Sequence, residues 1–130
     1  MSIRTAIGHI RELQSVSGST AKLDILRKYS DDEDFRKLLY YALNPMLTYK
    51  VSEKTLRTKT ALPDRAFLDL TIYDVCDTLN AKSALTNDDI GVLAQFLVLQ
   101  REDEAEFYIQ LLSKALRLGV TSTTVNKIFP

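Results

Sequence analysis

The sequence has few of the residues on which disulfide-stabilised, metal-binding and membrane proteins depend. Its 130 residues include one cysteine, one histidine, three prolines and four glycines, and there is no tryptophan. The lone Cys76 cannot form an internal disulfide, and no second cysteine completes a zinc ligand set. A single free thiol is typical of a reducing compartment, so we expect a cytoplasmic protein. The longest apolar run is too short to cross a membrane, so we expect no membrane partner.

The motifs of common catalytic sites are also missing. His9 lies on a predicted helix, and the sequence places no serine or cysteine nucleophile beside it, which gives a catalytic triad little support. There is no Gly-rich phosphate loop and no Gly-x-Gly pattern. The acidic residues at 88–89 and 102–106 lie in predicted first turns of helices, where negative charge is favourable. Helix position therefore explains them better than magnesium binding does, and we expect no metal site or catalytic residue.

The net charge is zero, with 17 basic and 17 acidic side chains, but the two signs are unevenly distributed. Residues 66–109 contain nine acidic and two basic side chains, which gives a local net charge of −7. Residues 110–130 contain three basic side chains and no acidic one, and residues 1–30 have a net charge of +3. Such polarity can orient a protein toward an anionic partner, although solvated helix faces produce the same pattern.

Apolar residues recur at helical spacing along most of the chain, and strand-like alternation is scarce. The sequence therefore predicts an all-α fold, a compact bundle of about six or seven helices in one domain over residues 1–130. The expected helices cover residues 3–13, a segment starting at Ser19 or Thr20, a segment from a Ser30–Glu33 capping box to Asn44, residues 68–79, a segment capped by Thr86, residues 103–118, and a short segment after Thr121 or Ser122. Gly119 is expected at the left-handed C-cap of the helix over 103–118. Residues 46–65 are predicted to form an extended connection.

Two glycine-containing segments carry the residue types that bind phosphate. The N-terminus of a helix offers unpaired N–H groups and a partial positive charge, and glycine allows a ligand to approach the backbone. Hydroxyl groups add hydrogen bonds, and long cations neutralise charge. The two segments are Gly18, Ser19, Thr20 and Lys22, and Arg117, Gly119, Thr121, Ser122, Thr124 and Lys127. The same residue types also serve as plain helix caps, so both interpretations stay open.

The second of these segments also resembles a known family. The stretch Lys-Ala-Leu-Arg-Leu-Gly-Val at residues 114–120 is similar to the segment that closes the helical DNA-binding domain of ATP-dependent DNA ligases, where a Leu-Arg-x-Gly-(Leu or Val) turn precedes a short helix. Residues 126–130 resemble the same place in the ligases of tailed phages. Residues 18–26 and 41–49 are similar to two further segments of those enzymes, so the likeness is ordered along the whole chain.

The resemblance implies the N-terminal domain of a phage-type ligase, which holds double-stranded, preferably nicked, DNA by its backbone across the minor groove during DNA repair and replication. It would lie in the cytoplasm of the bacterial host, and we expect a monomer. The family's catalytic Lys-x-Asp-Gly motif is absent, so we expect no catalysis by this chain alone and no cofactor in it. The resemblance implies ATP and Mg²⁺ for the catalytic domains, where AMP would pass from the lysine to the 5′ phosphate of the nick before the 3′ hydroxyl displaces it.

The residues expected to contact DNA come from the resemblance and from charge. Those that match the family segments are Gly18, Ser19, Thr20, Lys22, Lys114, Arg117, Gly119, Val120, Thr121, Ser122 and Lys127. Four basic residues of the predicted connection are added on charge alone, namely Lys50, Lys54, Arg57 and Lys59. The alternative is a helical protein-interaction adaptor without DNA affinity, whose acidic region 66–109 contacts a basic partner.

Overall fold

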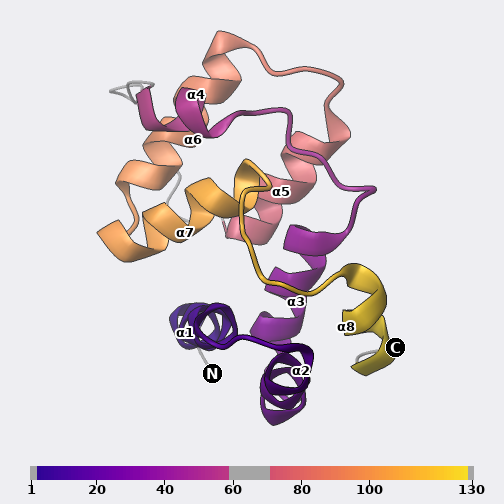
Figure 1. The fold of residues 1–130 in the computed structure, drawn as a ribbon. Helices are drawn as coiled ribbons and strands as arrows, with labels where there is room; N and C mark the ends of the chain where they lie inside the picture. Colours follow the sequence, from indigo (N-terminus) through magenta and orange to yellow (C-terminus); the bar gives the residue numbers. More distant parts are fainter. Residues whose placement is uncertain (1–2, 59–70, 129–130) are drawn as a thin grey trace. The chain divides into compact units, whose positions relative to one another are not determined.

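The computed structural model describes residues 3–58 and 71–128, and this part of the chain is helical, with no strand (Figure 1). The all-α prediction is confirmed, with eight helices in the described ranges instead of the six or seven expected. The chain divides into two compact units, one of residues 1–44 with 116–130 and one of residues 45–115. Whether residues 1–130 form one domain, and whether the bundle is of the ligase type, stay predictions.

The first unit contains four helices. They are α1 (Ile3–Ser15), α2 (Ser19–Lys28), α3 (Glu33–Leu43) and α8 (Ser122–Ile128). The helix α1 packs against α2 and α3, and α8 packs against α2 and α3. The apolar stripe predicted for α1 is buried, with Ile10 and Leu13 fully inaccessible to solvent, and Leu26 on α2 and Leu38 on α3 are fully buried as well. Helices from the first and the last part of the sequence thus lie in one unit.

A polar cluster inside the first unit joins α1 to the start of α3. The Nδ1 atom of His9 lies 2.8 Å from Oδ2 of the buried Asp32, and the imidazole stacks on the Tyr29 ring at 3.6 Å. The other carboxylate oxygen of Asp32 accepts a hydrogen bond from the N–H of Phe35, so Asp32 is the N-cap of α3. The predicted capping box of Ser30 and Glu33 is therefore wrong, because a carboxylate one residue before the helix satisfies that N–H group.

The second unit contains the other four helices. They are α4 (Glu53–Thr58), α5 (Ile72–Ala81), α6 (Asn87–Val98) and α7 (Glu102–Leu112). The helices α4, α6 and α7 pack against one another around aromatic side chains, of which Phe96 and Phe107 are almost fully buried. Thr86 caps α6 as predicted, in a capping box with Asp89, and the N–H of Thr86 lowers the pKa of the Asp89 carboxyl.

Two predicted features of the second unit are wrong. An extended connection is predicted over residues 46–65, but residues 53–58 form α4, which buries Leu56, and residues 59–65 lie outside the described residues. The predicted helix over 103–118 ends at Leu112, since the N–H of Lys114 bonds to the carbonyl of Leu111 and that of Ala115 to the carbonyl of Gln110. This pattern is a Schellman turn, with Lys114 in the left-handed conformation at a φ of 59°.

Gly119 does adopt a left-handed conformation, with a φ of 73°, but it lies in the turn before α8 and does not cap α7. The short final helix starts at Ser122, as predicted, and the N–H of Val125 bonds to the carbonyl of Thr121. None of the helices in the described ranges is long and apolar enough to span a bilayer.

Candidate nucleic-acid interface

The first predicted phosphate-binding segment lies at the start of α2. Gly18 is the N-cap residue, with a φ of 89°, and no side chain caps the helix there. A Cβ atom built on Gly18 would meet no atom within 4 Å among the described residues, so the backbone is open on that side. Ser19 and Thr20 are exposed, and the first turn of α2 contains no acidic residue. The N–H groups of this turn are accessible to an anion.

Lys22 connects this segment to the second one. Its Nζ atom donates a hydrogen bond of 2.8 Å to the carbonyl of Leu13 near the end of α1. A Cβ atom built on Gly119 would lie 2.5 Å from Cε and 3.2 Å from Nζ of Lys22, so the lysine chain passes directly over the glycine. Two of the three N–H donors of the ammonium are left after the bond to Leu13. The structure thus brings the two predicted segments together at Lys22 and Gly119.

The turn before α8 holds the remaining candidates of the first unit. Arg117 and Lys127 are exposed, whereas Val120 and Ser122 are half-buried. The backbone carbonyl of Arg117 accepts a hydrogen bond of 3.3 Å from Nε2 of Gln14, which ties the turn to α1. The sequence analysis missed Gln14, because nothing in a sequence reveals a contact between residues so far apart along the chain.

Thr121 acts mainly as a helix cap. Its Oγ1 atom accepts a long hydrogen bond of 3.4 Å from the N–H of Thr124. The helix α8 has only seven residues, so its dipole is small. Of the two interpretations of this segment, plain capping accounts for Thr121, and phosphate binding is assigned to Arg117, Gly119 and Lys127.

Acidic side chains near the first segment are engaged with partners of their own. Glu12 accepts a hydrogen bond of 2.7 Å from the hydroxyl of Tyr29 and lies 3.4 Å from Nζ of Lys28. The Tyr29 hydroxyl is the main reason why the pKa of Glu12 is lowered. Asp24 lies 4.0 Å from a guanidinium nitrogen of Arg27. These pairs reduce the repulsion that an approaching phosphate would meet on α2.

The basic candidates of the second unit are used differently. The ammonium of Lys50 donates to the carbonyls of Asn80 at 2.8 Å and of Leu79 at 3.3 Å, so it caps the C-terminal end of α5. Arg57 pairs with Glu106 at 2.6 Å and with Glu53 at 2.9 Å. Its pKa is raised, first by the hydrogen bond to Glu106. Both cations are already engaged within the protein.

Three other basic candidates, Lys54, Lys59 and Lys114, belong to this unit. Lys54 is exposed on α4, while Lys59 lies outside the described residues. The ammonium of Lys114 lies 5.5 Å from the centre of the buried Tyr49 ring, and burial lowers the pKa of Lys114. Cys76 is fully buried nearby, and the loss of water raises the pKa of its thiol to about 12, which leaves it protonated and unreactive.

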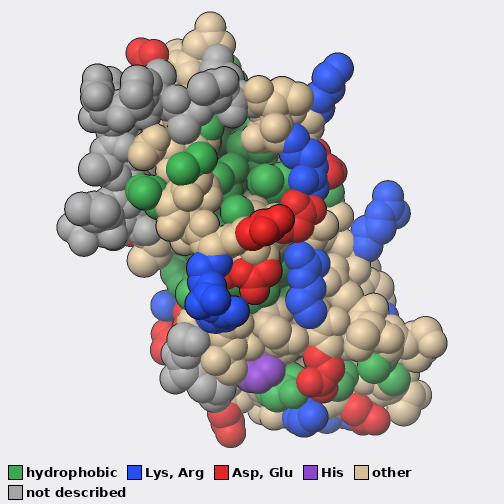
Figure 2. Space-filling model, turned by 90° about the vertical axis from the view of Figure 1, so that its left-hand side faces the viewer, with side chains coloured by type: hydrophobic (Ala, Val, Ile, Leu, Met, Phe, Trp, Pro, Cys, Tyr) green, Lys and Arg blue, Asp and Glu red, His purple; other side chains and the backbone are tan. Residues whose placement is uncertain are grey.

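One face of the molecule is visible in Figure 2, and acidic and basic side chains are interspersed on it. Within the described ranges, no three or more His, Cys, Asp or Glu side chains are grouped as a metal site would require. No family model matches the chain, and a search of curated proteins finds no match either. The likeness to DNA ligases therefore rests on the sequence segments described above.

Proposed function

We propose that this chain binds double-stranded DNA by its sugar–phosphate backbone, without reading bases, as the DNA-binding domain of an ATP-dependent DNA ligase. The observation that carries the proposal is the contact of Lys22 with Gly119. It makes one surface of two segments that were selected separately from the sequence, both for phosphate-binding residue types and for their likeness to ligases.

The chemistry of this surface suits phosphate. The uncapped first turn of α2 offers N–H donors at Gly18, where a ligand can approach the backbone. The Lys22 ammonium, beside Gly119, keeps two unused donors, and Arg117 and Lys127 are exposed. A guanidinium can hold a phosphate with two parallel hydrogen bonds, whereas an ammonium acts as a point charge. Such contacts position a duplex but carry no direct sequence information.

The proposed role is confined to holding DNA. The sequence has no Lys-x-Asp-Gly motif, so the transfer of AMP is assigned to catalytic domains outside the 130 residues. The chain would orient the duplex so that the nick meets those domains. ATP and Mg²⁺ belong to their chemistry.

The proposal is tested by the salt dependence of binding. Fluorescence anisotropy of labelled duplexes, nicked and intact and of two unrelated sequences, gives the dissociation constant over a range of salt concentrations. With about four phosphates neutralised, the slope of log K against log salt is expected near −3.6. The double variant R117A/K127A should reduce the slope by about 1.8 and weaken both sequences alike.

Arg57→Ala is the matched control, because its guanidinium is held by Glu53 and Glu106. We expect DNA affinity of this variant to stay within about twofold of the parent, with the salt slope unchanged. The proposal fails if R117A/K127A binds nicked duplex as tightly as the parent at low salt, or if Arg57→Ala weakens it equally. Affinity for a protein that survives high salt, with none for DNA, would favour the adaptor alternative.

A further inference from the structure

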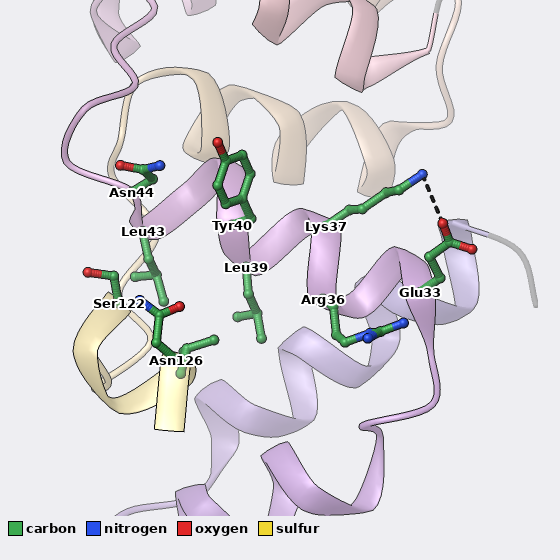
Figure 3. A pocket seen from close by; sticks show the side chains of 10 residues that line it. Glu33, Arg36, Lys37, Leu39, Tyr40, Leu43, Asn44, Ser122 and Asn126 are labelled. Carbon is green, nitrogen blue, oxygen red and sulfur yellow. Dashed lines mark ion pairs between the residues drawn. The ribbon is translucent and has the colours of Figure 1, made fainter. Parts of the chain in front are cut away.

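The first unit contains a groove between α3 and α8 that the proposed DNA contact does not use. Its volume is about 380 Å³, within the range of about 300 to 1,000 Å³ that is typical of ligand-binding pockets. Figure 3 shows the groove from close by, with Arg36, Leu39 and Leu43 pointing to the same side of α3. These three residues are spaced at intervals of three and four, so they form one stripe along the helix.

One end of the stripe is cationic and has an unused charge. Arg36 is exposed, and its guanidinium has no ion pair or hydrogen bond to any residue in the described ranges. The neighbouring cation Lys37 is engaged by Glu33, since Nζ lies 3.3 Å from the carboxylate (Figure 3). The groove therefore has a net positive charge at Arg36, and the planar guanidinium fits a carboxylate in a bidentate pair.

The other end of the groove is apolar with a polar rim. Leu43 is half-buried, and Leu39 and Val125 line the floor beside it. Ser122 and Asn126 face Leu43 from α8 (Figure 3). A carboxamide both donates and accepts hydrogen bonds, as a peptide bond does. The backbone N–H and C=O groups of an extended peptide are free to form hydrogen bonds with the Asn126 carboxamide, whereas those of a helical peptide are used internally.

The spacing along α3 sets the spacing within the peptide. Arg36 and Leu43 are seven residues apart, about 10 Å along a helix that rises about 1.5 Å per residue. An extended chain rises about 3.3 Å per residue, so three residues cover this distance. Duplex DNA fits less well, because the apolar floor offers nothing to phosphates and Arg36 is the one unused cation among the described residues that line the groove.

We propose that this groove binds an extended acidic peptide segment of a partner protein. A large apolar side chain of the peptide packs on Leu43, and a carboxylate three residues away pairs with Arg36. Asn126 and Ser122 hold the peptide backbone between these two contacts. The site is separate from Lys22 and Arg117, so it stands whether or not the chain binds DNA.

The test uses two synthetic eight-residue peptides with blocked ends, in which one leucine and one aspartate are three residues apart in either order and all other positions are Ser or Gly. Each is titrated into the ¹⁵N-labelled 130-residue chain, and amide shifts are followed by NMR. We expect one of them to shift resonances of residues 36–44 and 122–126 at millimolar concentration or below. Replacing its aspartate by lysine, or its leucine by serine, should abolish the shifts.

Protein variants then assign the carboxylate contact. Arg36→Ala should weaken binding about tenfold or more, because a hydrogen bond between charged groups is lost. Arg36→Lys should weaken binding less, because the charge is kept and only the geometry of the hydrogen bond changes. Arg101→Ala is the control, since Arg101 is an exposed cation of the second unit. Neither Arg36→Ala nor the control should change DNA affinity.

Four results would overturn the proposal. These are no shifts with either peptide at millimolar concentration, shifts confined to other residues, equal binding of the lysine peptide, and unchanged affinity in Arg36→Ala. If nicked duplex DNA shifts the same resonances and Arg36→Ala weakens DNA binding, the groove belongs to the DNA surface and the peptide assignment is wrong.

Discussion

Within residues 3–58 and 71–128, each compact unit has two residues in the left-handed backbone conformation, but the two units use different residue types. In the described ranges, the first unit uses Gly18 and Gly119, with φ of 89° and 73°. The second unit uses Lys50 and Lys114, both with φ of 59°. A residue with a Cβ atom loses about 1–2 kcal/mol in this conformation, and glycine loses almost none. The lysines must therefore be held there by other interactions.

Their side chains supply those interactions. Lys50 donates to the last carbonyls of α5, and Lys114 lies over the Tyr49 ring. The ammonium group of each lysine therefore makes its contacts within the protein. Glycine adopts this conformation without such interactions. No described atom lies within 4 Å of a Cβ built on Gly18, and the absence of a side chain at Gly119 leaves space for Lys22. The ammonium groups of Lys50 and Lys114 are thus used within the fold, whereas Lys22 beside Gly119 uses one donor for the Leu13 carbonyl and keeps two for a ligand.

The largest effect on stability is expected for Gly119→Ala. The new methyl group would lie 2.5 Å from Cε of Lys22, and the residue would have to keep a φ of 73°. The lysine would move, and its bond to the Leu13 carbonyl would weaken. We expect the free energy of unfolding, measured with urea, to fall by about 2–3 kcal/mol, from backbone strain and one lost hydrogen bond.

Gly18→Ala is the matched control for that variant. It has the same left-handed strain but meets no atom within 4 Å among the described residues, so a loss of about 1 kcal/mol is expected. Equal losses in the two variants would show that the contact of Lys22 with Gly119 contributes nothing, and the comparison between the units would lose its structural basis.

Much of the fold could be predicted from the sequence because helical periodicity is a local property. The apolar stripe of α1 and the hydroxyl cap at Thr86 follow from residues three and four apart. The features that the sequence did not predict depend on helix length and on packing. The six-residue α4 is too short for a periodic signal, and Asp32 and Ser30 are both good caps, between which only the packed structure decides.

The end of α7 and the role of the cations could not be predicted for a related reason. Gly119 is a better left-handed residue than Lys114 in any sequence, but contacts with Tyr49 favour the lysine. Arg57 and Glu106 are 49 residues apart along the chain, and in the fold they form an ion pair. The local charge of the sequence therefore suggests, wrongly, that Arg57 is an unpaired cation. The two glycine segments could be selected as candidates from the sequence because their pattern, glycine with hydroxyls and a cation, is local.

Lys50 allows the two contributions to a lysine turn to be separated. Lys50→Ala keeps the strain but loses the bonds to the carbonyls of α5, so we expect the free energy of unfolding to fall by about 1 kcal/mol. Lys50→Gly loses the same bonds but removes the strain, so it should unfold with about the free energy of the parent. A glycine variant no more stable than the alanine variant would mean that this turn is not strained. Neither variant should change DNA affinity.

The variants of Lys114 should show the same order of unfolding free energies as those of Lys50, with the smallest differences. An exposed cation–π contact contributes about 0.5–1 kcal/mol, so Lys114→Ala should lose about that amount and Lys114→Gly should equal the parent.

The pH dependence of the stability gives an independent check on Lys114. Because burial lowers the pKa of Lys114, the folded protein releases this proton more readily than the unfolded chain. The unfolded chain therefore binds more protons as the pH approaches the ordinary lysine value of 10.5, and the parent should gain stability relative to Lys114→Gly over that range. A difference that stays constant with pH would show that the ammonium is fully solvated, and Lys114 would then have to be grouped with the available cations of the first unit.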